Sequence, residues 1–345
     1  MSRVLMLALG LLVACGLALA AGEGGSASGP AHPAHEEFPA WFKESFLDLR
    51  EDVAEAARSG RRLMLYFHQE GCPYCTKLLR DNLGQKAIAD KTRRHFDVVA
   101  LNLWGDREVT DMTGRAMPEK AFARSMKVQF TPTLILFDEK GDVALRLNGY
   151  LPPHKFEAAL DFAGGRMEKT RRFGDYLAER AQEPAGGQLR EAAFLMPPPL
   201  RLADSLKRDG RPLMVLFEQK ECAACDEMHR EAFPRPEVSA LLGKFQVARI
   251  DMASREAVQT PAGDTLPSGV WARRMGVFYT PSLVFFDVGG REVFRVEGYL
   301  RPFHLASSLE YVSSGAYREQ PEFQRFISAR AVARRARGER IELMK

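Results

Sequence analysis

The chain has 345 residues, enough for about two domains of ordinary size. Hydrophobic residues make up 46% and charged residues 27%, which excludes a disordered, collagen-like or polytopic membrane chain. Lys and Arg exceed Asp and Glu by 49 − 45 = 4, too small an excess to indicate a nucleic-acid partner. Five cysteines are too few for a disulfide scaffold.

Residues 1–21 have the composition of a secretory signal peptide. Arg3 provides a positive start, Val4 to Leu19 is an almost continuous apolar run, and Ala18-Leu19-Ala20 is a small-x-small cleavage site. This order predicts export to the periplasm.

Two alternatives to soluble export stay open. Leu12-Val13-Ala14-Cys15 resembles a bacterial lipobox, so a lipoprotein anchored at Cys15 is the first alternative. A retained membrane anchor is the second. Residues 22–39 are rich in Gly, Ser, Pro and His without periodicity, and we expect a flexible linker there.

Further along the chain, hydrophobic periodicity and turn residues predict alternating helices and strands. Phe42, Phe46, Leu49 and Val53 recur at helical spacing and predict a helix over 40–58. The further elements, in chain order, are a buried strand at 63–67, a helix from the first Cys-x-x-Cys, a buried strand at 96–103, a helix at 118–126, paired strands at 133–137 and 143–147, a closing helix at 153–163 and an extra helix at 168–182.

The chain is a tandem duplication with a period of 149 or 150 residues. Residues 58–72 read RSGRRLMLYFHQEGC and residues 208–222 read RDGRPLMVLFEQKEC, identical at eight of fifteen positions. Residues 131–141, TPTLILFDEKG, match residues 280–290, TPSLVFFDVGG, at six of eleven. A period of this length indicates two whole domains.

We place the domains at 40–183 and 194–330, joined by a linker at 184–193. The extra helix of the second domain is expected at 322–333. Residues 331–345 form a basic tail that could contact anionic lipid, although a solvated helix end is the simpler interpretation.

The four cysteines after the leader form two Cys-x-x-Cys pairs, Cys72 with Cys75 and Cys222 with Cys225. Each pair follows a predicted strand and opens a predicted helix. The free N–H groups and the dipole of a helix N-terminus lower the pKa of the first thiol, and the spacing puts the second within disulfide reach. The pattern predicts thiol–disulfide exchange, in which one thiolate attacks and its neighbour resolves the mixed disulfide.

A structural zinc site is the alternative interpretation of Cys-x-x-Cys, but it needs four ligands. Each repeat offers two cysteines. His229 lies on the second helix, whereas Leu79 stands at the matching place in the first. We therefore expect neither a metal nor another cofactor.

The order of strand, Cys-x-x-Cys helix and Thr-Pro before another strand resembles the thioredoxin fold. The resemblance implies an α/β protein of two tandem thioredoxin-like domains, each a central mixed β-sheet flanked by helices, with an extra C-terminal helix per domain. It implies that Cys72 and Cys222 are the nucleophiles and that Cys75 and Cys225 resolve the mixed disulfide.

The resemblance also implies where substrate binds. Thr131-Pro132 and Thr280-Pro281 stand where this family has a cis proline facing the active site, and the preceding residue bonds the substrate backbone. We expect both prolines to be cis. Tyr74 is a further candidate for substrate contact, as a stacking surface; the alternative is packing on Pro73.

The segments LNLWGDREVTDMTG at 101–114 and GYLRPFHLASSLEYVSSGAYREQPEFQRF at 298–326 are similar to the exported thioredoxins of bacterial sulfur-oxidation systems. This similarity implies a periplasmic reductase of protein disulfides that a membrane thiol electron donor keeps reduced. Its partners would be disulfide-bearing periplasmic proteins, and peripheral membrane contact is compatible with the basic tail. A disulfide oxidase or isomerase, and a non-catalytic module carrying a metal or a thiol partner, stay open as alternatives.

The sequence departs from thioredoxin in its active-site dipeptides, which are Pro-Tyr and Ala-Ala rather than Gly-Pro. Thioredoxin's buried acid, six residues before the first cysteine, is replaced by Tyr66 and Leu216; His68 and Glu218 lie two residues further on. Residues 68–77 carry one acid and one base, whereas the matching stretch of the second repeat carries four acids and one base. Negative neighbours raise a thiol pKa, so we predict the lower pKa at the first attacking cysteine.

Overall fold

The computed structural model describes residues 38–180 and 185–341, which belong to one compact unit. The predicted signal peptide, the alternative anchor at Cys15 and nearly all of the predicted linker at 22–39 lie outside the described residues. None of the helices within the described ranges is long and apolar enough to cross a membrane.

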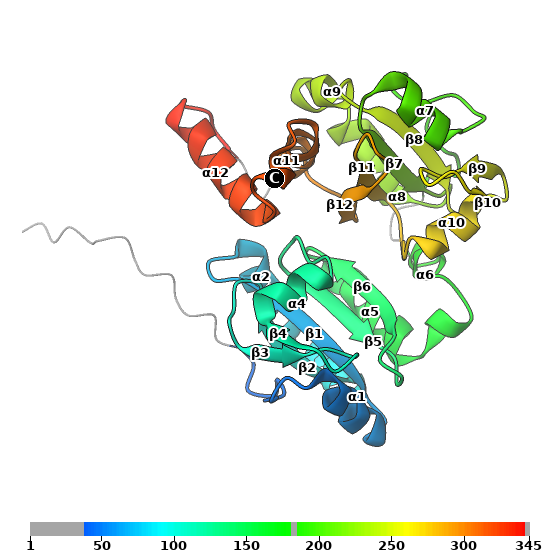
Figure 1. Cartoon of the computed structure of the whole chain (residues 1–345). Helices are drawn as coiled ribbons and strands as arrows, with labels where there is room; N and C mark the ends of the chain where they lie inside the picture. The colour runs from blue at the N-terminus through cyan, green and yellow to red at the C-terminus, as the bar shows by residue number, and fades with distance from the viewer. Residues whose placement is uncertain (1–37, 181–184, 342–345) are drawn as a thin grey trace, which may run out of the picture. The chain divides into compact units, whose positions relative to one another are not determined.

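The first repeat is built on a four-stranded mixed sheet in the order β2-β1-β5-β6 (Figure 1). The central strand β1 (Arg62–His68) pairs parallel with β2 (Phe96–Asn102) and antiparallel with β5 (Thr133–Phe137). The edge strand β6 (Val143–Asn148) pairs antiparallel with β5. β1 is buried along nearly its whole length because helices cover both of its faces, as its unbroken apolar sequence predicts.

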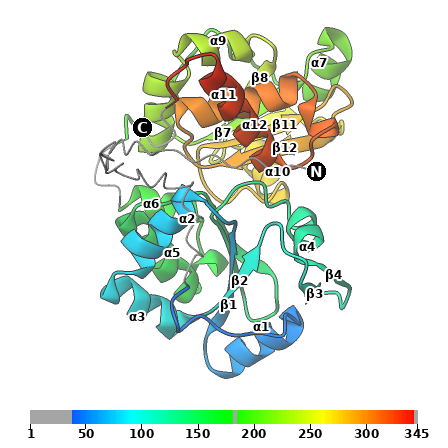
Figure 2. The ribbon, with the colours of Figure 1, turned by 90° about the vertical axis from the view of Figure 1, so that its left-hand side faces the viewer.

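Helices lie on both sides of this sheet (Figure 2). One face carries α3 (Lys86–His95) and α5 (Pro153–Gly164), and the other carries α1 (Leu49–Arg58) and α4 (Glu119–Ser125). Side chains alternate along β1, so its even-numbered residues join the α5 cluster and its odd-numbered residues join the α1 cluster.

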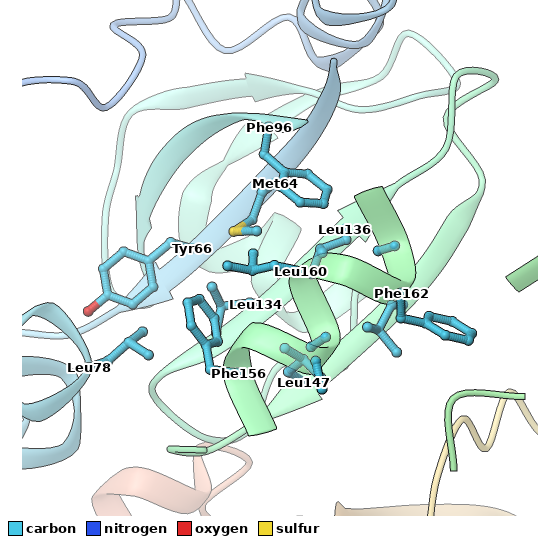
Figure 3. Close-up of a cluster of buried hydrophobic side chains, with 14 of the residues drawn as sticks. Met64, Tyr66, Leu78, Phe96, Leu134, Leu136, Leu147, Phe156, Leu160 and Phe162 are labelled. Carbon is cyan, nitrogen blue, oxygen red and sulfur yellow. The ribbon is translucent and has the colours of Figure 1, made fainter. Parts of the chain in front are cut away.

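The α5 face forms a continuous apolar cluster (Figure 3). Met64 and Tyr66 of β1 pack with Phe156 and Leu160 of α5. Both cysteines of the first Cys-x-x-Cys belong to the same cluster, so the first site rests directly on this core.

The predicted helix over 40–58 is wrong in its first half, since α1 begins only at Leu49. Asp48 caps the helix by accepting hydrogen bonds from the backbone amides of Arg50 and Glu51. Leu47 has a left-handed backbone conformation with φ 65°, which prevents the helix from continuing upstream. Phe46, one of the residues that suggested the longer helix, is fully exposed.

The other elements predicted for the first repeat are present, with bounds shifted by a few residues at most, except for the last. In place of a helix at 168–182, the described residues show a 3₁₀ turn, η2 (Met167–Lys169), followed by the short helix α6 (Phe173–Ala178). The sequence did not predict α3 or the small hairpin of β3 (Glu108–Thr110) and β4 (Ala116–Pro118).

The second repeat has the same topology, with strand order β12-β11-β7-β8. Its strands are β7 (Leu213–Glu218), β8 (Gln246–Asp251), β9 (Ala257–Gln259), β10 (Thr265–Pro267), β11 (Ser282–Phe286) and β12 (Glu292–Glu297). Its helical elements are α7 (Leu202–Asp209), α8 (Ala223–Glu227), η3 (Met228–Ala232), α9 (Pro236–Leu242), α10 (Ser268–Arg274), α11 (Pro302–Ser313), η4 (Ala316–Arg318) and α12 (Phe323–Ala336). Helix α12 therefore includes the first six residues of the segment predicted as a basic tail.

Candidate dithiol sites

The first Cys-x-x-Cys stands at the N-terminus of α2 (Pro73–Leu78), which continues into the π turn η1 (Leu79–Leu83). Cys72 is the N-cap residue, and its Sγ accepts a hydrogen bond from the backbone N–H of Cys75 at 3.1 Å. Pro73 at the first helical position has a φ suited to the helix and no N–H to leave unpaired. Cys72 is 4% exposed and Cys75 is fully buried, so the first cysteine is the more accessible of the pair.

The second site repeats this geometry at α8. Cys222 caps the helix, and its Sγ accepts a hydrogen bond from the N–H of Cys225 at 3.1 Å. Both pairs are joined as disulfides, with Cα–Cα distances of 5.2 Å. In the reduced protein the same N–H groups would point at the first sulfur of each pair, which favours its thiolate.

The peptide bonds Thr131-Pro132 and Thr280-Pro281 are both cis, as the sequence predicted. The hydroxyl of Thr131 donates a hydrogen bond to the Sγ of Cys72 at 3.3 Å, and the Thr131 carbonyl oxygen lies 3.4 Å from the same sulfur. The structure thus brings the first Thr-Pro dipeptide and the first cysteine together. Thr280 is only partly buried, whereas Thr131 is 6% exposed.

Different side chains lie at the places that correspond to thioredoxin's buried acid. In the first repeat, Tyr66 is fully buried, and its ring stacks on that of His68 with 5.7 Å between centroids. In the second repeat, Glu218 is 1% exposed and its Oε1 lies 2.9 Å from Nε2 of His229. The sequence places His229 on the helix but does not predict this pair, which the topology creates by bringing the end of β7 under η3.

The acidic residues of the second site also have partners outside the window in which they were counted. Asp226 pairs with Arg190 at 2.6 Å and accepts the N–H of Gly186 at 2.7 Å. Burial raises the pKa of Asp226, but the hydrogen bonds from Arg190 and Gly186 outweigh burial and hold it below its ordinary value. Part of the negative charge predicted to disfavour the second thiolate is therefore compensated by Arg190, from the segment between the repeats.

Tyr74 is half-buried rather than open to solvent. Its ring meets that of His304 edge-on, with 6.0 Å between centroids. The predicted stacking surface is therefore partly occupied by a side chain of the second repeat. No group of three or more His, Cys, Asp and Glu side chains within residues 38–180 and 185–341 is arranged to hold a metal ion.

A model of the thioredoxin-like domain matches the chain twice, over residues 49–164 and 203–313. The two segments together make up more than half of the chain, one in each repeat. The chain belongs to the thioredoxin-like family. The predicted tandem thioredoxin-like architecture is thereby confirmed.

Solved structures similar to the chain include thioredoxins and a thioredoxin-fold protein. A thioredoxin-fold protein from Helicobacter pylori is 26% identical, with a TM-score of 0.31, over 39% of this chain and 91% of that chain. A thioredoxin from Thermus thermophilus is 27% identical, with a TM-score of 0.27, over 33% and 81%. The periplasmic thioredoxin SoxS from Paracoccus pantotrophus is 24% identical, with a TM-score of 0.21, over 31% and 99%. Among curated proteins, no sequence matches the chain significantly.

Family and geometry agree on the chemistry. Each thioredoxin-like domain carries a Cys-x-x-Cys pair at disulfide distance, with its first sulfur at a helix N-terminus. The chain is a thiol:disulfide oxidoreductase.

Proposed function

We propose that the protein is an exported reductase of protein disulfides that works through both dithiol sites. The observation that carries this proposal is the placement of the first sulfur of each pair as a helix N-cap, where it accepts a backbone N–H. The reducing direction and the periplasm are supported by the leader sequence and by the similarity of residues 101–114 to exported thioredoxins. Disulfide-bearing periplasmic proteins would be the substrates, and a thiol donor at the membrane would restore the dithiols.

In the proposed reaction, the Cys72 thiolate attacks one sulfur of a substrate disulfide and forms a mixed disulfide, while the other substrate sulfur leaves as a thiolate. Cys75, after losing its proton, then attacks the Sγ of Cys72. This second step releases the remaining substrate sulfur as a thiolate and closes the Cys72–Cys75 disulfide. Two electrons pass to the substrate, whose two thiolates take up protons. Cys222 and Cys225 have the same roles in the second site.

Substrate would contact the Thr-Pro loops beside the sulfurs. The 3.3 Å hydrogen bond from the Thr131 hydroxyl to the Cys72 sulfur supports this role for Thr131 and Pro132. Thr280 and Pro281 take the corresponding position by the repeat. Tyr74, the residue after Pro73, would border the same surface.

Trapping tests the roles of the cysteines. With Cys75→Ser and Cys225→Ser combined, the resolving step is removed, so mixed disulfides with partner proteins should accumulate. The matched variant carries Cys72→Ser and Cys222→Ser, and it should trap none. Trapping by the second variant instead of the first would reverse the assignment.

A redox titration against glutathione tests the direction. Dithiols on this fold range from about −270 mV for thioredoxins to about −120 mV for strong oxidants. A reductase should titrate near the reducing end of this range, at about −250 mV or lower. A midpoint near the oxidising end would favour a disulfide oxidase or isomerase instead.

A further inference from the structure

The two repeats contact each other through the aromatic residues that precede the Thr-Pro dipeptides. Phe130, just before the first Thr-Pro, lies in the apolar cluster of the second repeat, and its ring centroid is 5.2 Å from that of Phe323, the first residue of α12. Tyr279, just before the second Thr-Pro, lies in the cluster of the first repeat, 5.9 Å from the ring of Phe173, the first residue of α6. Phe130 is 8% exposed and Tyr279 3%, so each repeat buries the aromatic residue beside the other's Thr-Pro loop.

The strand end beside the first Thr-Pro loop also contacts the second repeat. The N–H of Gly149, just after β6, donates a hydrogen bond to the Pro132 carbonyl oxygen at 2.8 Å, so the end of β6 borders this loop. Asn148 directly precedes Gly149, and its N–H donates to the Tyr279 hydroxyl at 3.3 Å. The side-chain amide of Asn148 donates to a carboxylate oxygen of Glu297, at the end of β12, at 2.6 Å. These hydrogen bonds join the repeats at the edge of the first Thr-Pro loop.

The extra C-terminal helix of each repeat reaches the loop that leads into the other's Cys-x-x-Cys. Gly174 of α6 packs on Gln219, three residues before the second pair, so closely that a Cβ on Gly174 would lie 2.9 Å from the side-chain oxygen of Gln219. At the first site the approach is made through Trp104. Its indole N–H donates to the side-chain oxygen of Gln69, three residues before the first pair, at 2.9 Å, and the guanidinium of Arg325 in α12 lies 4.8 Å over the Trp104 ring.

At the first site the second repeat also contacts the residue between the cysteines. The ring of Tyr74 meets that of His304, in the first turn of α11, with 6.0 Å between centroids. Cys72 is 4% exposed and Cys222 6%, so little of either attacking cysteine is open to solvent. The segments that substrate would contact in the proposed function are therefore the segments through which the two repeats contact each other.

We propose that the two repeats are docked on each other's substrate-binding surfaces, so that a protein disulfide reaches the sulfurs only when the repeats separate. Contacts between domains of one chain resemble transient protein interfaces, and relative motion of the domains is the ordinary expectation for them. A site that is open in only a fraction of the molecules binds its partner more weakly by that fraction. The contact between the repeats therefore limits the reaction with protein disulfides.

Docking of this kind selects reaction partners by size. A protein disulfide needs the whole surface around the Thr-Pro loop, which the other repeat covers, whereas a small thiol reagent needs only a path to the sulfur. The inference rests on the proposed function in one respect, that the Thr-Pro loops belong to the substrate-binding surfaces. The size selection itself does not depend on whether the protein reduces or oxidises its substrates.

Thiol reagents of different size test the inference in the full chain, with Cys75→Ser and Cys225→Ser as background. The rates at which Cys72 and Cys222 react with N-ethylmaleimide and with a maleimide on a long polyethylene glycol chain are compared, and mass spectrometry separates the two sites. The ratio of the large-reagent rate to the small-reagent rate should be far lower in the folded protein than in urea, where both thiols are open.

Phe130→Ala removes the ring that the second repeat buries. Truncation of a buried phenylalanine is strongly destabilising, so the repeats should separate more often and the ratio should rise at least about fivefold at both cysteines. Phe46→Ala truncates a fully exposed phenylalanine and should leave the ratio unchanged. An unchanged ratio in folded Phe130→Ala protein would overturn the inference. A rise at Cys72 alone would overturn it too, since separation of the repeats opens both sites.

Should Phe130→Ala fail to fold, a charge reversal between the repeats gives a second test. Lys127 pairs with Glu292 of the second repeat at 3.2 Å, and Lys127→Glu should raise the ratio about twofold at both cysteines. Lys120 pairs with Asp106 of its own repeat, so Lys120→Glu is the matched control and should have no effect. No rise with Lys127→Glu would count equally against the inference. Failure of the proposed function looks different, because the trapping and the redox titration would then fail while the size selection persisted.

Discussion

Acidification is expected to destabilise the protein through His304, a partly buried histidine near the start of α11. Burial and the nearby charge of Arg301 lower its pKa from the ordinary 6.5 to about 4 in the folded state. Between these two values the unfolded chain binds a proton that the folded chain does not. Folding stability therefore rises with pH in this window and is lost as pH falls from about 6.5 towards 4.

The magnitude follows from the difference between the two pKa values. Proton linkage with values of 6.5 and about 4 gives a loss of about 1 kcal/mol between pH 7.5 and 5.5. Near pH 4.5 the loss approaches about 2–3 kcal/mol, but carboxylates begin to titrate there and contribute their own changes. The effect of His304 alone is therefore best measured between pH 7.5 and 5.5.

Urea unfolding of the full chain at pH 7.5 and 5.5 measures this effect. His304→Gln removes the titrating group, so its free energy of unfolding should fall by about 1 kcal/mol less than that of the unchanged protein over the same interval. His154 is exposed in the first turn of α5, the equivalent helix, and His154→Gln serves as the control. The same pH dependence in His304→Gln as in the unchanged protein would refute the reasoning.

Three further outcomes are expected. Tyr279→Phe removes one hydrogen bond between the repeats, to Asn148, and one buried hydrogen bond within the second repeat, to Glu297. It should lower the free energy of unfolding by about 1–3 kcal/mol, measured by urea unfolding, whereas Tyr317→Phe, at a less buried hydroxyl, should change it by less than about 0.5 kcal/mol. Cys72 should show a lower pKa than Cys222 when alkylation is followed against pH in the background of Cys75→Ser and Cys225→Ser; equal or reversed values would contradict this. Fractionation of expressing bacteria should find the protein in the periplasm with a mature N-terminus near Ala21, and a cytoplasmic protein that keeps Met1 would contradict export.

Within each repeat, the sequence predicted most of the fold because the signals are local. The unbroken apolar run of β1, the Cys-x-x-Cys at a helix start and the Thr-Pro before β5 all identify their elements from a few neighbouring residues. The prediction failed at residues 40–48 because apolar residues at helical spacing also occur in an irregular segment that packs partly on the core. The left-handed backbone of Leu47 and the N-cap at Asp48 make α1 begin at Leu49 instead.

The site contacts that the sequence did not predict form only when separate elements of the fold come together. Glu218 and His229 meet because η3 lies over the end of β7, and Arg190 reaches Asp226 from the segment between the repeats. Self-similarity shows that two domains exist but not which of their surfaces meet, so the contact between Tyr74 and His304 could not be derived from the repeat.

These contacts change the physical reason for expecting Cys72 and Cys222 to have different pKa values, but they do not change which of the two pKa values is expected to be lower. A charge count along residues 218–227 treats each acid as a free charge beside Cys222, yet the structure gives Asp226 an arginine partner and gives Glu218 a histidine. The arginine reduces the field at the sulfur, since an ion-paired carboxylate acts at a distance as a dipole rather than as a full charge. The charge difference between the two sites is therefore smaller than the residues that flank each cysteine suggest, and the lower pKa expected at Cys72 depends on the acids that lack a cationic partner.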